Sequence, residues 1–294
     1  MNDSLRGNAR GHHRERGCRS VAVVCWALAL AACGTTESSP SESSPSESSP
    51  SATQAERAAE PNQLSPVDVE AGWRLLFDGT SFDGWRGLGR DEVPAEHWTI
   101  DEGAIRKVPS GEVPTAADGQ PLEGGDIMTV DTFEDFELMF ERKVAAGANS
   151  GIKYNVSEEM STAAPPLHAA LGFEYQILDD AVHPDAQNGP NRTAAALYDL
   201  MGPAPNKQLR PVGEFNEARL VFRRGHGEHW LNGAKVLEFD LETDAFAALL
   251  AASKYQPIEG FADQRAGHIV LQDHGDEVWF RSIKIRQLES PGSH

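Results

Sequence analysis

The segment best suited to chemistry reads Gly-Phe-Glu-Tyr-Gln-Ile-Leu-Asp-Asp. Its alternation predicts a strand whose apolar side chains at 173, 175 and 177 face a hydrophobic core. Glu174 and Gln176 then project together from the opposite face. A carboxylate beside a carboxamide can bind sugar hydroxyls, and the carboxylate can also transfer a proton. The alternative is an ordinary solvated strand face.

A polar loop follows this strand directly. It contains oxygen donors and one imidazole that could bind a calcium or transition-metal ion, and the candidate ligands are Asp179, His183 and Asp185. The spacing matches neither an EF-hand loop nor a His-x-x-x-His pair. A hydrogen-bonded loop braced by Arg192 is therefore the competing interpretation, and the sequence leaves a divalent metal cofactor open.

Two further segments carry polar groups at strand ends. In His-Ile-Val-Leu-Gln-Asp-His-Gly, alternation places Gln272 and His274 on one side, and a histidine beside Gly275 can titrate near neutral pH. In Asn-Ser-Gly-Ile-Lys-Tyr, Asn149 begins the segment and Lys153 could stabilise a developing oxyanion. Structural hydrogen bonding by the histidine and solvent exposure of the lysine are the alternatives.

Several other kinds of site have no matching motif. The chain has no Gly-x-Ser-x-Gly, no glycine-rich phosphate loop with lysine and no His-Glu-x-x-His. The Glu-x-Asp-x-x-Glu pattern of sandwich glucanases is broken because Gln176 stands at its centre, so a two-carboxylate glycosidase is weakly supported. A net charge of −19 argues against nucleic acid as a partner.

The elements that must position these residues are mostly strands. Apolar residues recur with a period of two, and Asn232-Gly233 between two apolar runs predicts a hairpin. Residues 243–255 alone show helical spacing, which predicts one short surface helix. The combination favours an all-β sandwich or jelly roll. The clearest alternating segments are 136–140, 173–177, 218–222 and 278–286.

The N-terminal part reads as an address and a tether. Residues 1–32 combine arginines with an apolar stretch too short to span a bilayer, which predicts a signal peptide. It ends in Leu-Ala-Ala-Cys-Gly, which resembles a lipobox and makes Cys33 the lipidated residue. Residues 33–66 contain ESSPS three times and predict a disordered tether, followed by one domain at 67–290. We therefore expect an exported lipoprotein of the cell envelope, attached to a membrane through Cys33.

Eight motifs in order across 71–288 resemble the 3-keto-disaccharide hydrolase domain family, also described as 3-keto-glucoside 1,2-lyase or 3-keto-2-hydroxyglucal hydratase. Two departures are Phe215, where the family usually has Trp, and Ser282, where it usually has Asn. The motifs are Leu76-Phe-Asp-Gly-Thr-Ser-Phe-Asp-Gly-Trp85, Asp135-Phe-Glu-Leu138, Asn149-Ser-Gly-Ile-Lys-Tyr154, Glu174-Tyr-Gln-Ile-Leu-Asp-Asp180, Leu197-Tyr-Asp-Leu200, His229-Trp-Leu-Asn-Gly233, Leu271-Gln-Asp-His-Gly275 and Phe280-Arg-Ser-Ile-Lys284.

The resemblance implies a concanavalin A-like jelly-roll sandwich that cleaves 3-keto-glucosides. Such a reaction needs a base at C2, an acid at the glycosidic oxygen and an electrophile at the C3 oxygen. We expect Glu174 and His274 to be the base and acid, in either order. Lys153 or a divalent ion would stabilise the enolate. The substrate-binding candidates are Asn149, Lys153, Gln176, Arg192 and Gln272.

Three other functions remain compatible with the sequence. A lectin-type carbohydrate-binding module is the main alternative, because the same sandwich binds sugars without catalysis. A surface adhesion or scaffold domain and ordinary glycoside hydrolysis are the others. The sugar, the anomer, the metal and the oligomeric state stay open.

Overall fold

The computed structural model describes residues 60–109, 124–163 and 169–289. The predicted signal peptide, Cys33 and the ESSPS repeats lie outside these ranges. Within them, no helix is both long enough and apolar enough to cross a membrane.

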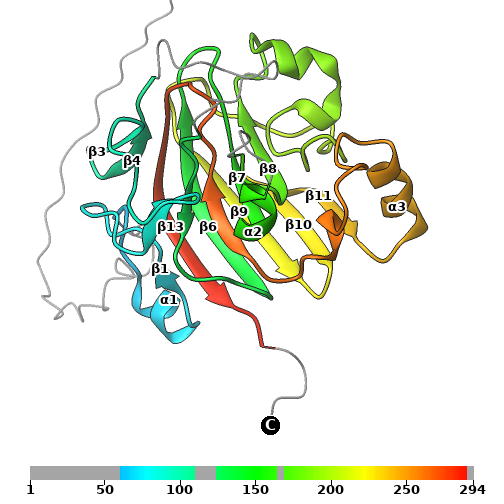
Figure 1. The fold of residues 1–294 in the computed structure, drawn as a ribbon. Coiled ribbons are helices and arrows are strands. Elements are labelled where there is room, and N and C mark those ends of the chain that lie inside the picture. The colour runs from blue at the N-terminus through cyan, green and yellow to red at the C-terminus, as the bar shows by residue number, and fades with distance from the viewer. Residues whose placement is uncertain (1–59, 110–123, 164–168, 290–294) are drawn as a thin grey trace, which may run out of the picture. The chain divides into compact units, whose positions relative to one another are not determined.

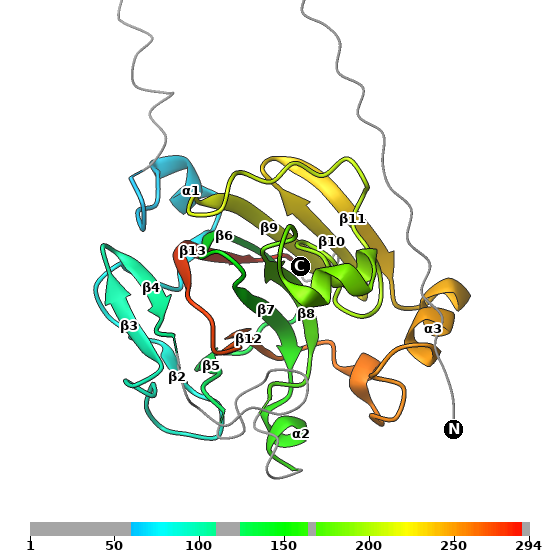
Figure 2. The same cartoon turned by 90° about the horizontal axis from the view of Figure 1, so that it is seen from above.

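The described domain consists of two antiparallel sheets, which form two layers (Figures 1 and 2). The larger sheet has the order β11 (Ala234–Asp240), β10 (His226–Leu231), β9 (Asn216–Arg223), β6 (Phe136–Val144), β13 (Val278–Gln287), β4 (Ala104–Lys107) and β3 (Trp98–Asp101), with β1 (Arg74–Leu75) paired to β13. The smaller sheet has the order β2 (Trp85–Gly87), β5 (Ile127–Thr129), β12 (His268–Leu271), β7 (Asn149–Val156) and β8 (Phe173–Leu178). The jelly-roll prediction is confirmed.

The core lies between the sheets and is built from alternate residues of their strands. On β8, the predicted inward residues Phe173, Tyr175 and Ile177 all belong to this core. They meet aromatic residues of the larger sheet, for example Phe140, whose ring lies edge-on to Tyr175 at 5.6 Å between centroids. The predicted hairpin is also present, with Asn232 and Gly233 at φ 47° and 81° between β10 and β11. Period-two alternation therefore identified both the strands and the faces they bury.

The prediction of a single helix is wrong for the described residues. The predicted helix is present as α3 (Asp244–Ala251), where Thr243 accepts a hydrogen bond from the N–H of Phe246. Two five-residue helices, α1 (Pro66–Glu70) and α2 (Glu158–Thr162), are set by serine caps and are too short to show helical periodicity. Three 3₁₀ helices, η1 (Pro184–Asn188), η2 (Pro190–Arg192) and η3 (Phe261–Asp263), lie in the connecting segments.

The domain extends further toward the N-terminus than the predicted boundary at residue 67. The Asn62 side chain donates to the carbonyl of Gly103 and accepts from the N–H of Ser282, at 2.8 and 2.7 Å. The last residues of the predicted tether are therefore part of the fold. Ser282 lies at a bulge of β13 with φ 52°, a conformation that Asn adopts more readily than Ser.

His229 is a neutral histidine inside the core. Its side chain is fully buried, and burial lowers its pKa to about 4. Nδ1 donates to the carbonyl oxygen of Ala195 at 3.1 Å, and Nε2 accepts from the hydroxyl of Tyr154 at 3.0 Å. Both ring nitrogens are thus satisfied in the uncharged form, which burial favours.

We expect this histidine to make folding sensitive to acid. The unfolded state binds the proton at higher pH than the folded state, so stability is lost as pH falls from about 6.5 toward 4. Between about pH 7 and pH 5 the free energy of unfolding should fall by roughly 2 kcal/mol from this residue alone. Urea denaturation at both pH values measures it. His229→Phe should remove that part of the slope, whereas His226→Gln, on the same strand but partly exposed, should retain it.

Candidate active site

Three neighbouring strands bring most of the predicted site residues to the outer face of the smaller sheet. On β8 and β7, Glu174 lies opposite Lys153, and Gln176 lies opposite Gly151. Just after β12, the backbone N–H of Gln272 donates to the carbonyl oxygen of Gly151 at 3.0 Å. Because side chains alternate between the faces, Glu174, Gln176 and Gln272 all point away from the core.

These side chains meet in one small pocket. Its accessible volume is about 10 Å³, which is room for roughly one water molecule. Glu174 and His274 both line it, as the predicted mechanism requires. The lining residues are Asn149, Glu174, Gln176, Tyr198, Lys254, Gln272 and His274.

Glu174 is a buried carboxyl group at the base of this pocket. Its side chain is 3 % exposed, and burial raises its pKa above the usual value for glutamate. The positive charge of Lys153, with Nζ 4.0 Å from Oε2, partly offsets that rise. A carboxylate whose pKa is moved toward neutrality is suited to taking and returning a proton.

Gly151 leaves the space that the Glu174 carboxyl group occupies. A Cβ at position 151 would lie 2.6 Å from Oε1 and 2.8 Å from Cγ of Glu174. We expect Gly151→Ala to displace the carboxyl group and lower kcat/KM by roughly 10- to 100-fold, because small misplacements of a reacting group are costly. Steady-state kinetics measure this effect. Gly233→Ala, which strains the β10–β11 turn at φ 81° without meeting a neighbouring atom, is the control for backbone strain outside the pocket lining; equal losses of kcat/KM in both variants would contradict the prediction.

Two carboxamides in the pocket have acceptor atoms without a hydrogen-bond partner among the described residues. They are Oδ1 of Asn149 and Oε1 of Gln272, in side chains that are 3 % and 4 % exposed. Buried acceptors are normally satisfied, so these two atoms are suited to receiving donors from a ligand. Sugar hydroxyl groups supply such donors, so the binding role of both residues stays a prediction that this geometry allows.

Lys153 is buried next to Glu174 and does not line the pocket. Its side chain is 5 % exposed, and its Nζ donates to the carbonyl oxygen of Ala170 at 3.1 Å. Its positive charge also offsets part of the rise in the pKa of Asp126 that burial causes. Direct contact with a substrate oxyanion, as predicted for Lys153, does not fit this depth. From this position the positive charge of Lys153 instead lowers the pKa of Glu174.

Arg192 also lies outside the pocket lining, where it braces the loop after β8. Its guanidinium donates to Asp185, Asp199 and the hydroxyl of Tyr198 at 3.2, 2.5 and 2.7 Å. This is the loop-bracing role that the sequence offered as the alternative to substrate binding. Arg192 thereby fixes Tyr198, which does line the pocket.

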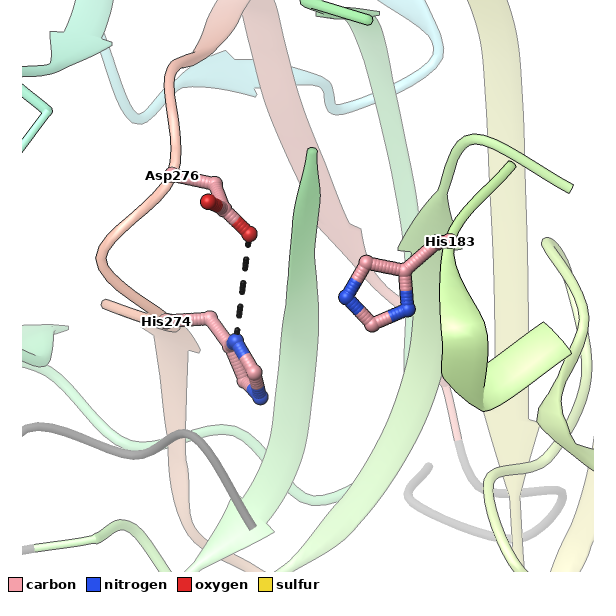
Figure 3. Close-up of side chains that lie close together, drawn as sticks. All are labelled: His183, His274 and Asp276. Atoms are coloured by element: carbon pink, nitrogen blue, oxygen red, sulfur yellow. Dashed lines mark ion pairs between the residues drawn. The ribbon is translucent and has the colours of Figure 1, made fainter. Parts of the chain in front are cut away.

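The predicted metal ligands Asp179, His183 and Asp185 do not form one cluster. Asp179 accepts backbone N–H groups from Gly147 and Ala181, and Asp185 binds Arg192, so their oxygens serve the loop. Of the three, only His183 belongs to a group with metal-binding geometry among the described residues, together with His274 and Asp276 (Figure 3). The structure therefore does not bring the three together as one metal site, although Oδ2 of Asp185 is buried without a hydrogen-bond partner among the described residues.

The sequence analysis missed Tyr198 and Lys254, which come from two separate loops. Lys254 Nζ lies 4.4 Å from the centre of the Tyr198 ring, and the Arg192 guanidinium lies 4.7 Å from it. Burial raises the pKa of Tyr198, and the nearby charge of Glu174 raises it further. The motif Leu-Tyr-Asp-Leu was the only sequence signal for Tyr198, and none distinguished Lys254.

Comparison with known proteins identifies the family of the chain. Residues 72–286 match the 3-keto-α-glucoside-1,2-lyase-like domain. The chain belongs to that family. A 3-keto-disaccharide hydrolase of Bacteroides thetaiotaomicron is 38 % identical over 252 residues, covering 79 % of this chain and 84 % of the relative. The predicted family is confirmed, and the chain is a carbohydrate-active enzyme of the glycoside hydrolase or lyase type.

Solved structures support the same fold for this member of the lyase-like family. A Parabacteroides distasonis protein provisionally described as a glycosyl hydrolase has a TM-score of 0.66 and 27 % identity, over 78 % of this chain and all of that chain (100 %). A second structure with the same description and organism has a TM-score of 0.52 and 28 % identity, over 74 % and 99 % of the two chains.

Proposed function

We propose that this enzyme cleaves the glycosidic bond of 3-keto-glucosides by elimination, followed by addition of water. The observation that carries the proposal is the shared pocket of Glu174 and His274, in which a buried carboxyl group with a raised pKa lies beside an imidazole. The named activity of the Bacteroides relative supports the substrate class.

The chemistry follows from the ketone at C3, which acidifies the hydrogen on C2. A base takes that proton, a double bond forms between C1 and C2, and the bond from C1 to the aglycone oxygen breaks. The aglycone oxygen takes up a proton as it leaves. Water then adds its hydroxyl group to C1 and a proton to C2, so the net result is hydrolysis.

Each step has a residue in the pocket suited to it. Glu174 takes the proton from C2, and its raised pKa lets it return one during hydration. His274 stabilises the C3 oxygen, where negative charge develops during the elimination. Tyr198 is protonated at neutral pH, and its hydroxyl can donate that proton to the departing aglycone oxygen. Asn149 and Gln272 bind sugar hydroxyl groups.

The proposal is tested with a 3-keto-glucoside and its unoxidised parent. We expect aglycone release only from the oxidised substrate. Chromatography of the aglycone and the sugar product measures it. In heavy water, deuterium should enter at C2. Release from the parent glucoside at a similar rate would indicate ordinary hydrolysis instead. Binding of unoxidised oligosaccharides without any release would favour the lectin-type module.

The pH dependence should reveal the influence of Lys153 on Glu174. The reaction requires ionised Glu174, so activity falls as pH drops toward its raised pKa. Lys153→Met removes a charge that lowers this pKa, so the loss should begin at higher pH. On the acid side of the profile we expect kcat/KM to fall several-fold below that of wild type, and on the alkaline side to match it. Lys284 lies on β13 of the larger sheet and forms an ion pair with Asp68 of α1. Lys284→Met should leave the pH profile unchanged.

We also propose that the enzyme is exported and anchored to a membrane through a lipid on Cys33. The arginines and apolar stretch of 1–32 and the sequence Leu-Ala-Ala-Cys-Gly support it. Labelling of cells with a radioactive fatty acid should mark the wild-type protein and not Cys33→Ser. Equal labelling of both would contradict the assignment.

A further inference from the structure

Arg142 is a positively charged side chain buried inside the domain. It lies on β6 and points into the space between the two sheets, because it alternates with the core residues Leu138 and Phe140. Its neighbours on the adjacent strands, Asn216 and Phe280, are buried too. Arg142 is 1 % exposed, so its charge is almost completely withdrawn from solvent.

Two nitrogens of this guanidinium have no hydrogen-bond acceptor among the described residues. They are Nε and Nη2, and both atoms are buried. The N–H groups of these two nitrogens point the same way and form one edge of the planar group, an edge that arginine presents to carboxylates and other anions. Buried donors are normally satisfied, and buried charges are normally paired. The edge of Arg142 is therefore suited to receiving a negatively charged acceptor.

Two other arginines of the larger sheet use the same edge to bind a carboxylate. Nε and Nη2 of Arg281, on β13, donate to the two oxygens of Glu141 at 2.9 and 3.4 Å. Nε and Nη2 of Arg106, on β4, both donate to one oxygen of Glu277, from Nε at 2.7 Å. A single acceptor atom can thus occupy the whole edge. Both of these ion pairs are partly exposed, whereas Arg142 is buried.

The charged groups that act on Arg142 leave one positive charge unbalanced. Asp180 attracts Arg142, but its Oδ2 lies 2.7 Å from Nζ of Lys207, and its Oδ1 accepts the N–H of Ala194 at 2.7 Å. Lys207 is itself a cation that repels Arg142. Tyr175 adds no negative charge, because burial raises the pKa of its hydroxyl. Two cations thus share one carboxylate.

The burial of the edge indicates a small monovalent anion. One negative charge balances the excess, and a multivalent anion such as phosphate or sulfate loses more hydration free energy when it enters a buried site. A spherical halide receives both N–H groups at one point, as the single Glu277 oxygen does at Arg106. Chloride meets these requirements, and bromide is its heavier probe.

We propose that Nε and Nη2 of Arg142 bind one chloride ion inside the domain. The ion neutralises the charge that the fold buries, and it thereby stabilises the folded state. The two charged groups that act on Arg142, Asp180 and Lys207, also pair the two ends of residues 180–207, the segment that contains the pocket residue Tyr198. Arg142 does not line that pocket, and the inference does not depend on the proposed function.

Thermal unfolding in different salts tests the site. The Tm of the full-length protein is measured by circular dichroism at constant ionic strength while sodium chloride replaces sodium gluconate, whose anion is too large for a buried edge. We expect the wild-type Tm to rise by roughly 3–5 °C between zero and about 100 mM chloride. Arg142→Met removes the buried charge at similar volume. Its Tm should not respond to chloride, and in gluconate it should equal or exceed that of wild type.

Arg106→Met is the matched control, because it removes an arginine of the same sheet that already has a carboxylate partner. Its Tm should respond to chloride as that of wild type does. A wild-type Tm that is the same in chloride and gluconate would overturn the inference, and so would a chloride response that is equally large in Arg142→Met.

A crystal of the wild-type protein grown in sodium bromide gives a second measurement that needs no variant. We expect anomalous scattering to locate one bromide ion at hydrogen-bond distance from Nε and Nη2 of Arg142. A water molecule in that place, without anomalous signal, would show that the edge is satisfied by water and would overturn the inference.

Discussion

Glu174→Gln is expected to lower kcat for a 3-keto-glucoside by roughly 10³-fold, the usual contribution of a positioned proton-transfer group. Glutamine keeps the shape of the side chain and cannot take a proton. The buried setting strengthens the expectation, because no other carboxylate lines the pocket among the described residues. Steady-state kinetics measure the loss, and the incorporation of deuterium at C2 should disappear in parallel.

Binding should survive the same substitution. Substrate affinity, measured by calorimetry in the inactive variant, should stay within about tenfold of wild type because the carboxamide retains hydrogen-bonding capacity. Glu141→Gln, which loses an ion pair to Arg281 on the larger sheet, is the matched control and should retain full activity. A Glu174→Gln enzyme that keeps more than about a tenth of wild-type kcat would remove Glu174 from the mechanism.

Asp273→Asn is expected to destabilise the domain by about 3–5 kcal/mol, the usual cost of breaking a buried ion pair. Asp273 is fully buried and lies between two partners, with Lys107 Nζ at 3.1 Å and His97 Nδ1 at 2.5 Å. Lys107 is also fully buried, so neutralising Asp273 removes a compensating negative charge from its surroundings. Urea denaturation at neutral pH measures the change.

The effect should reach the pocket as well as stability. Asp273 lies between Gln272 and His274, and its Oδ1 accepts the N–H of Gly275 at 2.8 Å, which fixes the turn that presents both pocket residues. A double variant with Lys107→Met should recover part of the lost stability, because both charges are then absent. Asp131→Asn, from an exposed pair with Arg74, should cost less than about 1 kcal/mol. An Asp273→Asn loss no larger than that of Asp131→Asn would contradict the argument.

The sequence analysis succeeded where the physics is local. Alternation along 173–177 depends only on the backbone period of a strand, so it correctly placed Glu174 and Gln176 on the face away from the core. The Asn232-Gly233 hairpin was predictable for a similar reason, because two adjacent residues at positive φ determine the turn.

The tertiary structure decided which side chains from these strands and loops lie next to one another. Strand register placed Lys153 opposite Glu174, where its side chain is buried and does not line the pocket. The packing of loops brought Tyr198 and Lys254 over the same strands and paired His183 with His274.

The sequence by itself determined the fold class, the family and the polar strand faces. Periodicity depends on neighbouring residues, and the order of motifs can be read along the chain without knowing its contacts. Only the tertiary structure distinguished Asp276 from the many other acidic residues as a partner of His183 and His274. Contacts between distant loops depend on the register of the strands that carry them and on the packing beneath them, which no local pattern contains.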